Sequence, residues 1–215
     1  MSTLLRLALT KGRLESDMRQ LLAAAGVDIS PLLDTGRRLI HRLPDAGIEV
    51  VLAKAPDVIT YIEHGVCELG VVGKDTILEL GSSFYEVLDL GFGACRFALA
   101  AREGDDFFGS TRHRRVASKY PKVTAAYFAG RGMDAEIIKI EGSVELAPIL
   151  GLADAIVDIV ETGATLSANG LAPIEDICPI SARLIVNVAA MKMKKAAVQD
   201  FVALCRRRLE GEGCP

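Results

Sequence analysis

The feature that most constrains this chain is an alternation of short apolar, β-branched runs with stretches of helical periodicity. Leu4–Leu9 predicts a buried strand, and a helix is expected after it over Glu15–Ala25, with Met18, Leu21 and Leu22 on one face. The same alternation continues along most of the 215 residues. Strands that alternate with helices are typical of α/β proteins.

The alternation is interrupted in two places. Tyr85–Leu90 and Arg96–Ala101 are strand-like runs with no helix between them, and Ile177–Asn187 is extended again. We interpret the first pair as a crossover into a second lobe and the last run as the return. The sequence therefore predicts two α/β lobes with a ligand in the cleft between them. The first lobe is expected to comprise residues 1–94 and 181–215, and the second residues 95–180.

Composition narrows the kind of ligand and compartment. The 25 Lys and Arg against 28 Asp and Glu give a formal charge of −3, so no broad cationic face for nucleic acid is expected. The 5 scattered cysteines without a Cys-x-x-Cys pair favour neither a disulfide framework nor a zinc site. Neither a signal peptide nor an uninterrupted apolar stretch of about 18 residues is visible, so we expect a soluble, cytoplasmic protein with no membrane partner.

The most informative segment is an apolar strand, Ala155–Val160, followed by a glycine-containing turn. Asp158 lies near the end of the strand, and Thr162 and Thr165 flank Gly163 where a helix could begin. Such a turn can point several backbone N–H groups at one phosphate, while a neighbouring carboxylate suits ribose hydroxyls or Mg²⁺. The structural alternative is an ordinary strand–turn–helix with Thr162 as the N-cap.

Basic residues follow other predicted strands. Lys11 and Arg13 flank Gly12 directly after the first strand, and Arg37 with Arg38 forms a second pair. Open α/β sheets bind ligands at the carboxyl ends of their strands, so these cations are candidates to neutralise an anionic substrate. The alternative for each pair is a solvated surface, which we favour for at least one of Arg37 and Arg38.

Two further candidates have structural alternatives of their own. Gly73, in Val-Val-Gly-Lys-Asp, repeats the arrangement of a strand followed by a glycine, but an ordinary strand-to-helix turn explains it equally well. Glu145 stands at helix-start spacing from Ser143, so it either caps a helix or faces the ligand. The 3 histidines show neither metal-ligand spacing nor a Ser/His/Asp grouping, so no protein metal site and no covalent nucleophile is expected.

Together these segments resemble the ATP phosphoribosyltransferase family, which carries out the first step of histidine biosynthesis. The matching segments are residues 7–14, 57–75, 115–121 and 142–166, which together span nearly the whole chain. The last is the most specific, because Asp158–Leu166 corresponds to the family's loop for phosphoribosyl pyrophosphate. Thr10, Lys54 and Ile59 depart from the family pattern, since proline, arginine and proline are usual there.

The resemblance implies a two-lobed fold like that of type II periplasmic binding proteins, with the active site in the interlobe cleft. It implies transfer of the phosphoribosyl group of phosphoribosyl pyrophosphate to N1 of the ATP adenine, with release of pyrophosphate and with Mg²⁺ on the substrate phosphates. Catalytic roles are implied for Arg13, Arg37 and Asp158. The implied substrate-binding residues are Lys11, Arg38, Lys54, Gly73, Asp75, Glu145, Glu161, Thr162, Gly163, Ala164, Thr165 and Leu166.

The resemblance also implies a partner. The sequence ends soon after a single amphipathic helix expected over Lys192–Leu209, without the histidine-binding domain of the family's long form. We therefore expect the short form, a homo-dimer or hetero-oligomer that pairs with a regulatory subunit resembling histidyl-tRNA synthetase. Histidine is then expected to inhibit only when that subunit is present.

Two other classes of function stay open. A solute-binding or ligand-sensing module could use the same lobes without chemistry, although the missing export signal and DNA-binding segment count against it. A nucleobase phosphoribosyltransferase could share the Thr-Gly-x-Thr turn. That class usually has an acidic pair directly before the turn, whereas two apolar residues separate Asp158 from Glu161 here.

Overall fold

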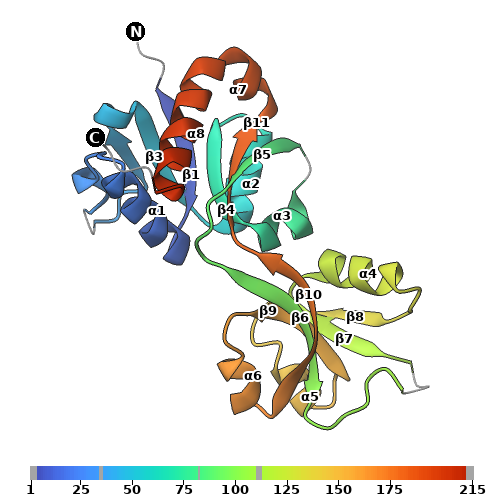
Figure 1. Cartoon of the computed structure of the whole chain (residues 1–215). Helices are drawn as coiled ribbons and strands as arrows, with labels where there is room; N and C mark the ends of the chain where they lie inside the picture. Colours follow the sequence, from blue (N-terminus) through green and yellow to red (C-terminus); the bar gives the residue numbers. More distant parts are fainter. Residues whose placement is uncertain (1–3, 34–35, 82, 110–112, 212–215) are drawn as a thin grey trace. The chain divides into compact units, whose positions relative to one another are not determined.

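The structure, a computed structural model, describes residues 4–33, 36–81, 83–109 and 113–211 (Figure 1). The chain divides into two compact units, each with its own sheet and helices. Unit 1 comprises Met1–Gly93 and Ser181–Pro215, and unit 2 comprises Ala94–Ile180. Ala94 thus lies in unit 2, one residue away from the boundary that the sequence predicted. Both units are α/β, as the alternation of strands and helices predicted.

Unit 1 is built on a six-stranded sheet in the order β2-β3-β1-β4-β11-β5. Its strands are β1 (Leu5–Thr10), β2 (Ile40–Leu43), β3 (Ile48–Ala53), β4 (Leu69–Gly73), β5 (Phe84–Asp89) and β11 (Ala182–Asn187). Its helices are α1 (Arg13–Ala24), α2 (Ala55–Glu63), α3 (Lys74–Leu80), α7 (Val188–Met193) and α8 (Lys195–Leu209), with the 3-10 turns η1 (Ser30–Leu32) and η2 (Pro44–Ala46). Because β1 pairs in parallel with β3 and β4, these three strands end together, at what we call the carboxyl edge of unit 1.

Helices cover both faces of this sheet. Leu5, Leu7 and Leu9 of β1 are buried on one face with α1, α7 and α8, whereas Ala8 is buried on the other face with α2. This alternation follows from the two-residue period of a strand. The residues predicted to face inward from α1 are buried, namely Met18, Leu21 and Leu22.

Unit 2 is built on a five-stranded sheet in the order β10-β6-β9-β7-β8. Its strands are β6 (Cys95–Arg102), β7 (Arg115–Ser118), β8 (Glu136–Lys139), β9 (Ala155–Val160) and β10 (Leu171–Ile180). Its helices are α4 (Pro121–Gly130), α5 (Leu146–Ile149) and α6 (Ala164–Ala168). Here β7 pairs in parallel with β8 and β9, so these three strands end at the carboxyl edge of unit 2.

The two faces of the unit 2 sheet differ in the size of their side chains. One face packs aromatic residues together: Phe97 of β6 and Tyr120, which directly precedes α4, form an edge-to-face pair with ring centroids 4.9 Å apart. The other face presents Ala98, Ala100 and Ala117. These small side chains let the short helices α5 and α6 approach the sheet closely.

Both predicted crossovers are present. β5 and β6 do not pair with each other, because β5 belongs to the sheet of unit 1 and β6 to that of unit 2. The return is made by β10 in unit 2 and β11 in unit 1, which are separated by Ser181. The extended run begins at Leu171, earlier than the expected Ile177, because β10 continues along β6 past two irregularities in register.

The prediction of one continuous helix over Lys192–Leu209 is wrong at its start. The segment contains the end of α7, a break at Lys194 and then α8. The Asn187 side chain accepts a hydrogen bond from the Ala190 N–H at 3.0 Å, which starts α7 earlier than expected. Lys194 leaves the helical conformation at φ −122°, and its ammonium pairs with Glu68 at 2.6 Å. None of the helices in the described ranges is long and apolar enough to cross a membrane.

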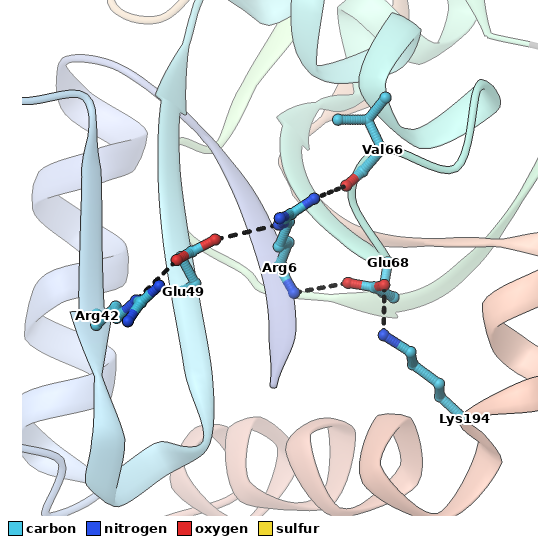
Figure 2. A network of polar contacts seen from close by, with 6 residues as sticks. All are labelled: Arg6, Arg42, Glu49, Val66, Glu68 and Lys194. Atoms are coloured by element: carbon cyan, nitrogen blue, oxygen red, sulfur yellow. Dashed lines mark hydrogen bonds and ion pairs between the residues drawn. The ribbon is translucent and has the colours of Figure 1, made fainter. Parts of the chain in front are cut away.

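A polar network lies near the starts of β1, β3 and β4, at the edge of the unit 1 sheet opposite its carboxyl edge (Figure 2). The Glu49 carboxylate accepts hydrogen bonds from Arg6 Nε at 3.1 Å and from Arg42 Nε at 3.0 Å, so it joins β1, β2 and β3. The Arg6 backbone N–H donates to Glu68 at 2.7 Å, and Glu68 also holds Lys194. The network therefore ties three strands to the break between α7 and α8.

This network makes the stability of unit 1 sensitive to acid. Hydrogen bonds from Arg42 and Arg6 hold the pKa of Glu49 below its ordinary value. A carboxyl with a lowered folded pKa stabilises the fold above its unfolded pKa of about 4.3, and this contribution is lost as the pH falls through the folded pKa. We therefore expect Glu49→Gln to lower the free energy of unfolding by about 1 kcal/mol at pH 7 and by less at pH 3.5. Urea unfolding measures both values, and an equal loss at the two pH values would contradict the ionic role.

Candidate active site

The carboxyl edge of unit 1 brings three predicted site residues together. The register of β1 and β3 sets Thr10 beside Ala53, so Lys11 and Lys54 leave the sheet from neighbouring positions. The Lys11 N–H donates to the Ala53 carbonyl at 3.0 Å, which continues the pairing by one residue. Gly73 is the last residue of β4 on the other side of β1. Both lysines are exposed at this edge.

Thr10, which departs from the family pattern, has a structural role here. Its hydroxyl donates a hydrogen bond to the Val71 carbonyl at 2.9 Å, from β1 across to β4. A proline at this position has no hydroxyl and no N–H to donate. The threonine therefore adds a side-chain link between two strands just before the cations begin.

Gly12 sets the turn that carries Lys11 and Arg13. Its backbone lies at φ +97° and ψ −131°, a conformation that favours glycine. The Gly12 N–H donates to the Glu15 carboxylate at 3.3 Å, and Glu15 also pairs with Arg19. Arg13 then begins α1 and is exposed. The capping role of Glu15 was not predicted from the sequence, although an acid three residues after a glycine at a helix start is a capping signal.

The second basic pair, Arg37 with Arg38, lies at the same edge. Arg37 and Arg38 precede β2, whose neighbour in the sheet is the end of β3. The Leu52 N–H donates to the Leu39 carbonyl at 2.8 Å, so the chain just before β2 runs beside the last residues of β3. Both arginines are exposed, so exposure does not separate a binding role from a solvated one.

The Asp75 carboxylate explains why residue 73 is a glycine. A Cβ on Gly73 would lie 2.0 Å from Asp75 Oδ1, so the carboxylate occupies the space that a side chain would need. The Thr76 hydroxyl donates to Asp75 Oδ2 at 3.3 Å and helps to hold it there. The structure thus favours the strand-to-helix turn at Gly73 and leaves Asp75 as the polar group at this strand end.

Asp158 is a predicted site residue whose pKa is raised above its ordinary value. Burial on β9 raises the pKa of its carboxyl to about 6, although a hydrogen bond from the Ile159 backbone opposes the rise. The negative charge of Glu145 raises it further, and the positive charge of Lys119 lowers it. Shifts caused by burial together with specific neighbouring charges are common at functional sites. At neutral pH the group is a carboxylate that is close to protonation.

Glu145 does not cap a helix through its side chain. It precedes the short helix α5, but its side chain makes no capping hydrogen bond there. The Leu146 N–H donates instead to the Ser143 carbonyl at 3.3 Å. Glu145 is half-buried and close enough to Asp158 to raise the pKa of that carboxyl. Of its two readings, the structure favours the one in which Glu145 belongs with Asp158.

The turn after β9 has the glycine geometry that the sequence suggested. Gly163 lies at φ +81° and is itself the N-cap of α6, so Thr162 is not the cap that the structural alternative required. The Thr162 hydroxyl accepts from the Ala164 N–H at 3.3 Å. Thr165 is exposed, and its carbonyl accepts from the Asn169 side chain at 2.8 Å. The Thr162 hydroxyl therefore stabilises the turn by a hydrogen bond inside it.

The remaining residues of the predicted loop divide between surface and core. Glu161 is exposed, and its carbonyl accepts from Arg96 Nη1 at 3.3 Å. Ala164 is also exposed. Leu166, by contrast, is only 4% exposed and packs in the hydrophobic core of unit 2. The Leu166 side chain therefore belongs to the core of unit 2.

Two residues beside Asp158 were missed as site candidates. The buried Ser118 hydroxyl, at the end of β7, donates to the Val157 carbonyl at 2.7 Å. Lys119 follows it and is exposed. The signal that could have found them is a polar pair directly after a short apolar strand, since such positions lie at the carboxyl edge of a parallel sheet.

Comparison with known proteins decides the family. A model of the ATP phosphoribosyltransferase family matches residues 54–207. The chain belongs to this family. It is 56% identical to the ATP phosphoribosyltransferase of Clostridium kluyveri over 92% of this chain and 90% of that protein. It is 53% identical to the ATP phosphoribosyltransferase of Bacillus mycoides over 95% of this chain and 97% of that protein.

Comparison with solved structures identifies the fold. The ATP phosphoribosyl transferase (HisG:HisZ) complex from Thermotoga maritima matches with a TM-score of 0.82 and 34% identity, over 96% of this chain and 99% of the matched chain. The periplasmic aliphatic sulphonate binding protein SsuA from Escherichia coli matches with a TM-score of 0.61 and 14% identity, over 95% of this chain and 72% of that one. The second likeness shows the fold alone, a two-lobed type II fold shared with periplasmic binding proteins.

The turn at Gly163 can be tested through its backbone. A Cβ there would lie 3.9 Å from Val160 Cγ1, which is an ordinary contact, so an added methyl costs mainly the strain of a positive φ, about 1–2 kcal/mol. We expect Gly163→Ala to weaken phosphoribosyl pyrophosphate binding at least ~10-fold while the protein stays folded, and Gly163→Val to weaken it more. Calorimetric titration measures the affinity.

Gly170 provides the matched control. It has a similar φ of +67° and open space around its Cβ position, but it lies after α6, outside the turn. Gly170→Ala carries comparable strain and should retain parent affinity. Equal losses of affinity in the two variants would remove the turn from the site.

Proposed function

We propose that this chain catalyses the reaction for which its family is named, at the residues described above. The phosphoribosyl group passes from phosphoribosyl pyrophosphate to N1 of the ATP adenine, and pyrophosphate leaves. The observation that carries the assignment to these residues is the turn at Thr162–Gly163 directly after the strand that holds Asp158. The solute-binding alternative shares the fold, but the sequence identity is to transferases.

The chemistry requires positioning and charge rather than a covalent intermediate. As the bond to pyrophosphate breaks, positive charge develops on the ribose ring and negative charge on the leaving group. A site that holds both reactants in line and opposes these charges lowers the barrier. Asp158 stands where a carboxylate can hold ribose hydroxyls and offset the ring charge, while Glu145 adds a second negative group.

The cations of unit 1 suit the phosphates. Lys11, Arg13 and Lys54 are exposed at the carboxyl edge, and Arg37 and Arg38 add two guanidinium groups. Arginine binds phosphate oxygens in a bidentate fork, whereas lysine acts as a point charge. Lys54, which stands where the family usually has arginine, therefore supplies charge with less geometric control. We assign Arg13 and Arg37 to the leaving pyrophosphate.

Mg²⁺ fits this scheme as a companion of the substrate phosphates. The described ranges contain no group of three or more His, Cys, Asp and Glu side chains placed to hold a metal ion by themselves. Mg²⁺ commonly binds through one or two carboxylates together with substrate phosphates and water. Asp158 and Glu145 provide such a pair. The ion would neutralise phosphate charge in the complex.

Asp158→Asn tests the catalytic assignment. In a mixture of ATP, phosphoribosyl pyrophosphate and Mg²⁺, the parent should release pyrophosphate, and the variant should lose at least ~10-fold in kcat, about 1.4 kcal/mol, with a modest change in KM. Burial has raised the folded pKa above the unfolded one, so the carboxyl contributes stability at low pH that is lost as the pH rises towards about 6. The neutral amide should therefore raise the melting temperature at pH 8.

Asp134→Asn, in an exposed loop before β8, is the control and should retain parent kcat and stability. A variant at Asp158 that loses stability but keeps kcat would show a structural role. Absence of pyrophosphate release from the parent itself would overturn the function.

A regulatory partner follows from the same likeness. The matched Thermotoga maritima structure is titled as a HisG:HisZ complex, and nearly all of the matched chain corresponds to this one. We propose that this chain likewise works with a second subunit, one that resembles histidyl-tRNA synthetase and carries the histidine response. Allostery requires a second site with a differential effect on the first, and the partner provides it.

Histidine titration tests this division of labour. Histidine should leave pyrophosphate release by the purified chain unchanged and should inhibit once the partner subunit is added. The readout is the initial rate at several histidine concentrations, with and without the partner. Saturable inhibition of the isolated chain that competes with neither substrate would contradict this proposal.

A further inference from the structure

The Arg96 guanidinium joins the two strands that flank β6, and the proposed mechanism gives it no role. β6 lies between β10 and β9 in the sheet of unit 2. Arg96 Nε donates to the Asp176 carboxylate on β10 at 2.6 Å, and Arg96 Nη1 donates to the Glu161 carbonyl at 3.3 Å. Glu161 directly follows β9 and precedes the turn at Thr162–Gly163. One planar side chain therefore connects β10 to the turn that we propose binds phosphate.

The backbone of Arg96 fixes where this connection begins. Arg96 pairs with Val160, the last residue of β9, so its side chain starts beside the point where the turn leaves the sheet. The hydrogen bond from the Ala164 N–H to the Thr162 hydroxyl, at 3.3 Å, links the turn only to itself. The hydrogen bond from Arg96 to the Glu161 carbonyl, by contrast, ties the start of the turn to the sheet.

An irregularity in register brings Asp176 to the side of the sheet on which Arg96 lies. The pairing of β10 with β6 skips Ile177, so Asp176 pairs with Ala98. Ala98 and Arg96 are two residues apart on β6, and side chains two apart on a strand lie on the same face. In a continuous register Asp176 would pair with Leu99 and lie on the opposite face. The irregularity therefore places the carboxylate that holds the Arg96 guanidinium, as bulges beside functional sites often do for a side chain.

We propose that Arg96 is a positioning residue that holds the Thr162–Gly163 turn in the conformation that binds a phosphate of phosphoribosyl pyrophosphate. This inference deepens the proposed function and rests on it. Backbone N–H groups bind a phosphate well only when they point to it together, and a turn that is free to move must be ordered at a cost in affinity. Asp176 acts through Arg96, because it fixes the guanidinium that contacts the turn.

Calorimetric titration with phosphoribosyl pyrophosphate, together with the KM of each substrate, tests the role of Arg96. Arg96→Met removes both hydrogen bonds and should weaken binding of phosphoribosyl pyrophosphate about 10-fold and raise its KM by a similar factor. The KM of ATP should stay within about 2-fold of the parent value, because the turn is assigned to the other substrate. Arg96→Lys keeps the charge but replaces the planar fork by a single ammonium, so it should remain about 5-fold weaker or more.

Asp176 provides a test that the effect passes through Arg96. Asp176→Asn weakens the hold on the guanidinium and should lower the affinity for phosphoribosyl pyrophosphate about 3-fold. Once Arg96 has been replaced by Met, the carboxylate has no guanidinium to fix. The double variant should therefore bind as weakly as Arg96→Met and no more weakly.

Arg115→Met is the matched control, at the other end of β9. The Arg115 guanidinium pairs with Asp154 at 3.2 Å, and its side chain is 39% exposed, against 33% for Arg96. The Arg115 N–H still donates to Asp154 in the variant, since that bond, at 2.8 Å, is made by the backbone. Arg115→Met thus removes a similar ion pair from unit 2 without touching the turn, and it should keep the parent affinity. A loss equal to that of Arg96→Met would show a general effect of stability and would contradict the positioning role.

Two further outcomes overturn the proposal. Parent affinity in Arg96→Met would mean that the turn does not need the guanidinium. Full recovery in Arg96→Lys would mean that the charge alone matters, as it would for a residue that binds the substrate itself.

A last measurement needs neither substrate nor turnover. In ¹H–¹⁵N NMR spectra, Asp176→Asn should shift the amide signals of Thr162 and Gly163 in the parent, and it should leave them in place when Arg96 is already Met. Signals that respond equally in both backgrounds would contradict a link through Arg96. A parent that neither binds phosphoribosyl pyrophosphate nor releases pyrophosphate would overturn the proposed function, while these spectra would still decide whether Arg96 positions the turn.

Discussion

Parallel pairing of three neighbouring strands within each sheet is the constraint on which the rest of this structure depends. In unit 1, β1 is paired on both sides with strands that run in its own direction, and in unit 2 β7 is paired in the same way. Parallel strands must end at the same edge, so segments far apart in the chain deliver their following residues to one place. The backbone positions of Lys11 and Lys54 are neighbours for this reason. The candidate chemistry is therefore a consequence of strand direction.

The electrostatic division between the units follows from what comes after each strand. Unit 1 places exposed lysines and arginines at its carboxyl edge, where water solvates them. Unit 2 places Asp158 and Glu145 close together, partly out of water, where the ionised form of Asp158 is costly. Sites that need a particular ionisation state often hold it at the expense of stability.

Much of this arrangement could be predicted from the sequence, because periodicity and strand ends are local signals. Ala155–Val160 forms a strand with the bounds expected of it, and the inward face of α1 is the one that its spacing indicated. Contacts between distant segments could not be predicted in the same way. Nothing in the order of residues around Gly73 reveals that the Asp75 carboxylate fills the space beside it. Leu166, in the most specific motif of the chain, turned out to serve the core.

The insertion of unit 2 into unit 1 has a consequence for the order in which the chain can fold during synthesis. β11 lies between β4 and β5 in the sheet of unit 1, yet it is made only after the whole of unit 2. Unit 2 is continuous in sequence, so it can fold as soon as its last strand has left the ribosome. Until residues 182–187 follow, β5 has no neighbour to pair with, and β4 presents an open edge. The sheet of unit 1 therefore stays incomplete until β11, from the C-terminal part of the chain, has been synthesised.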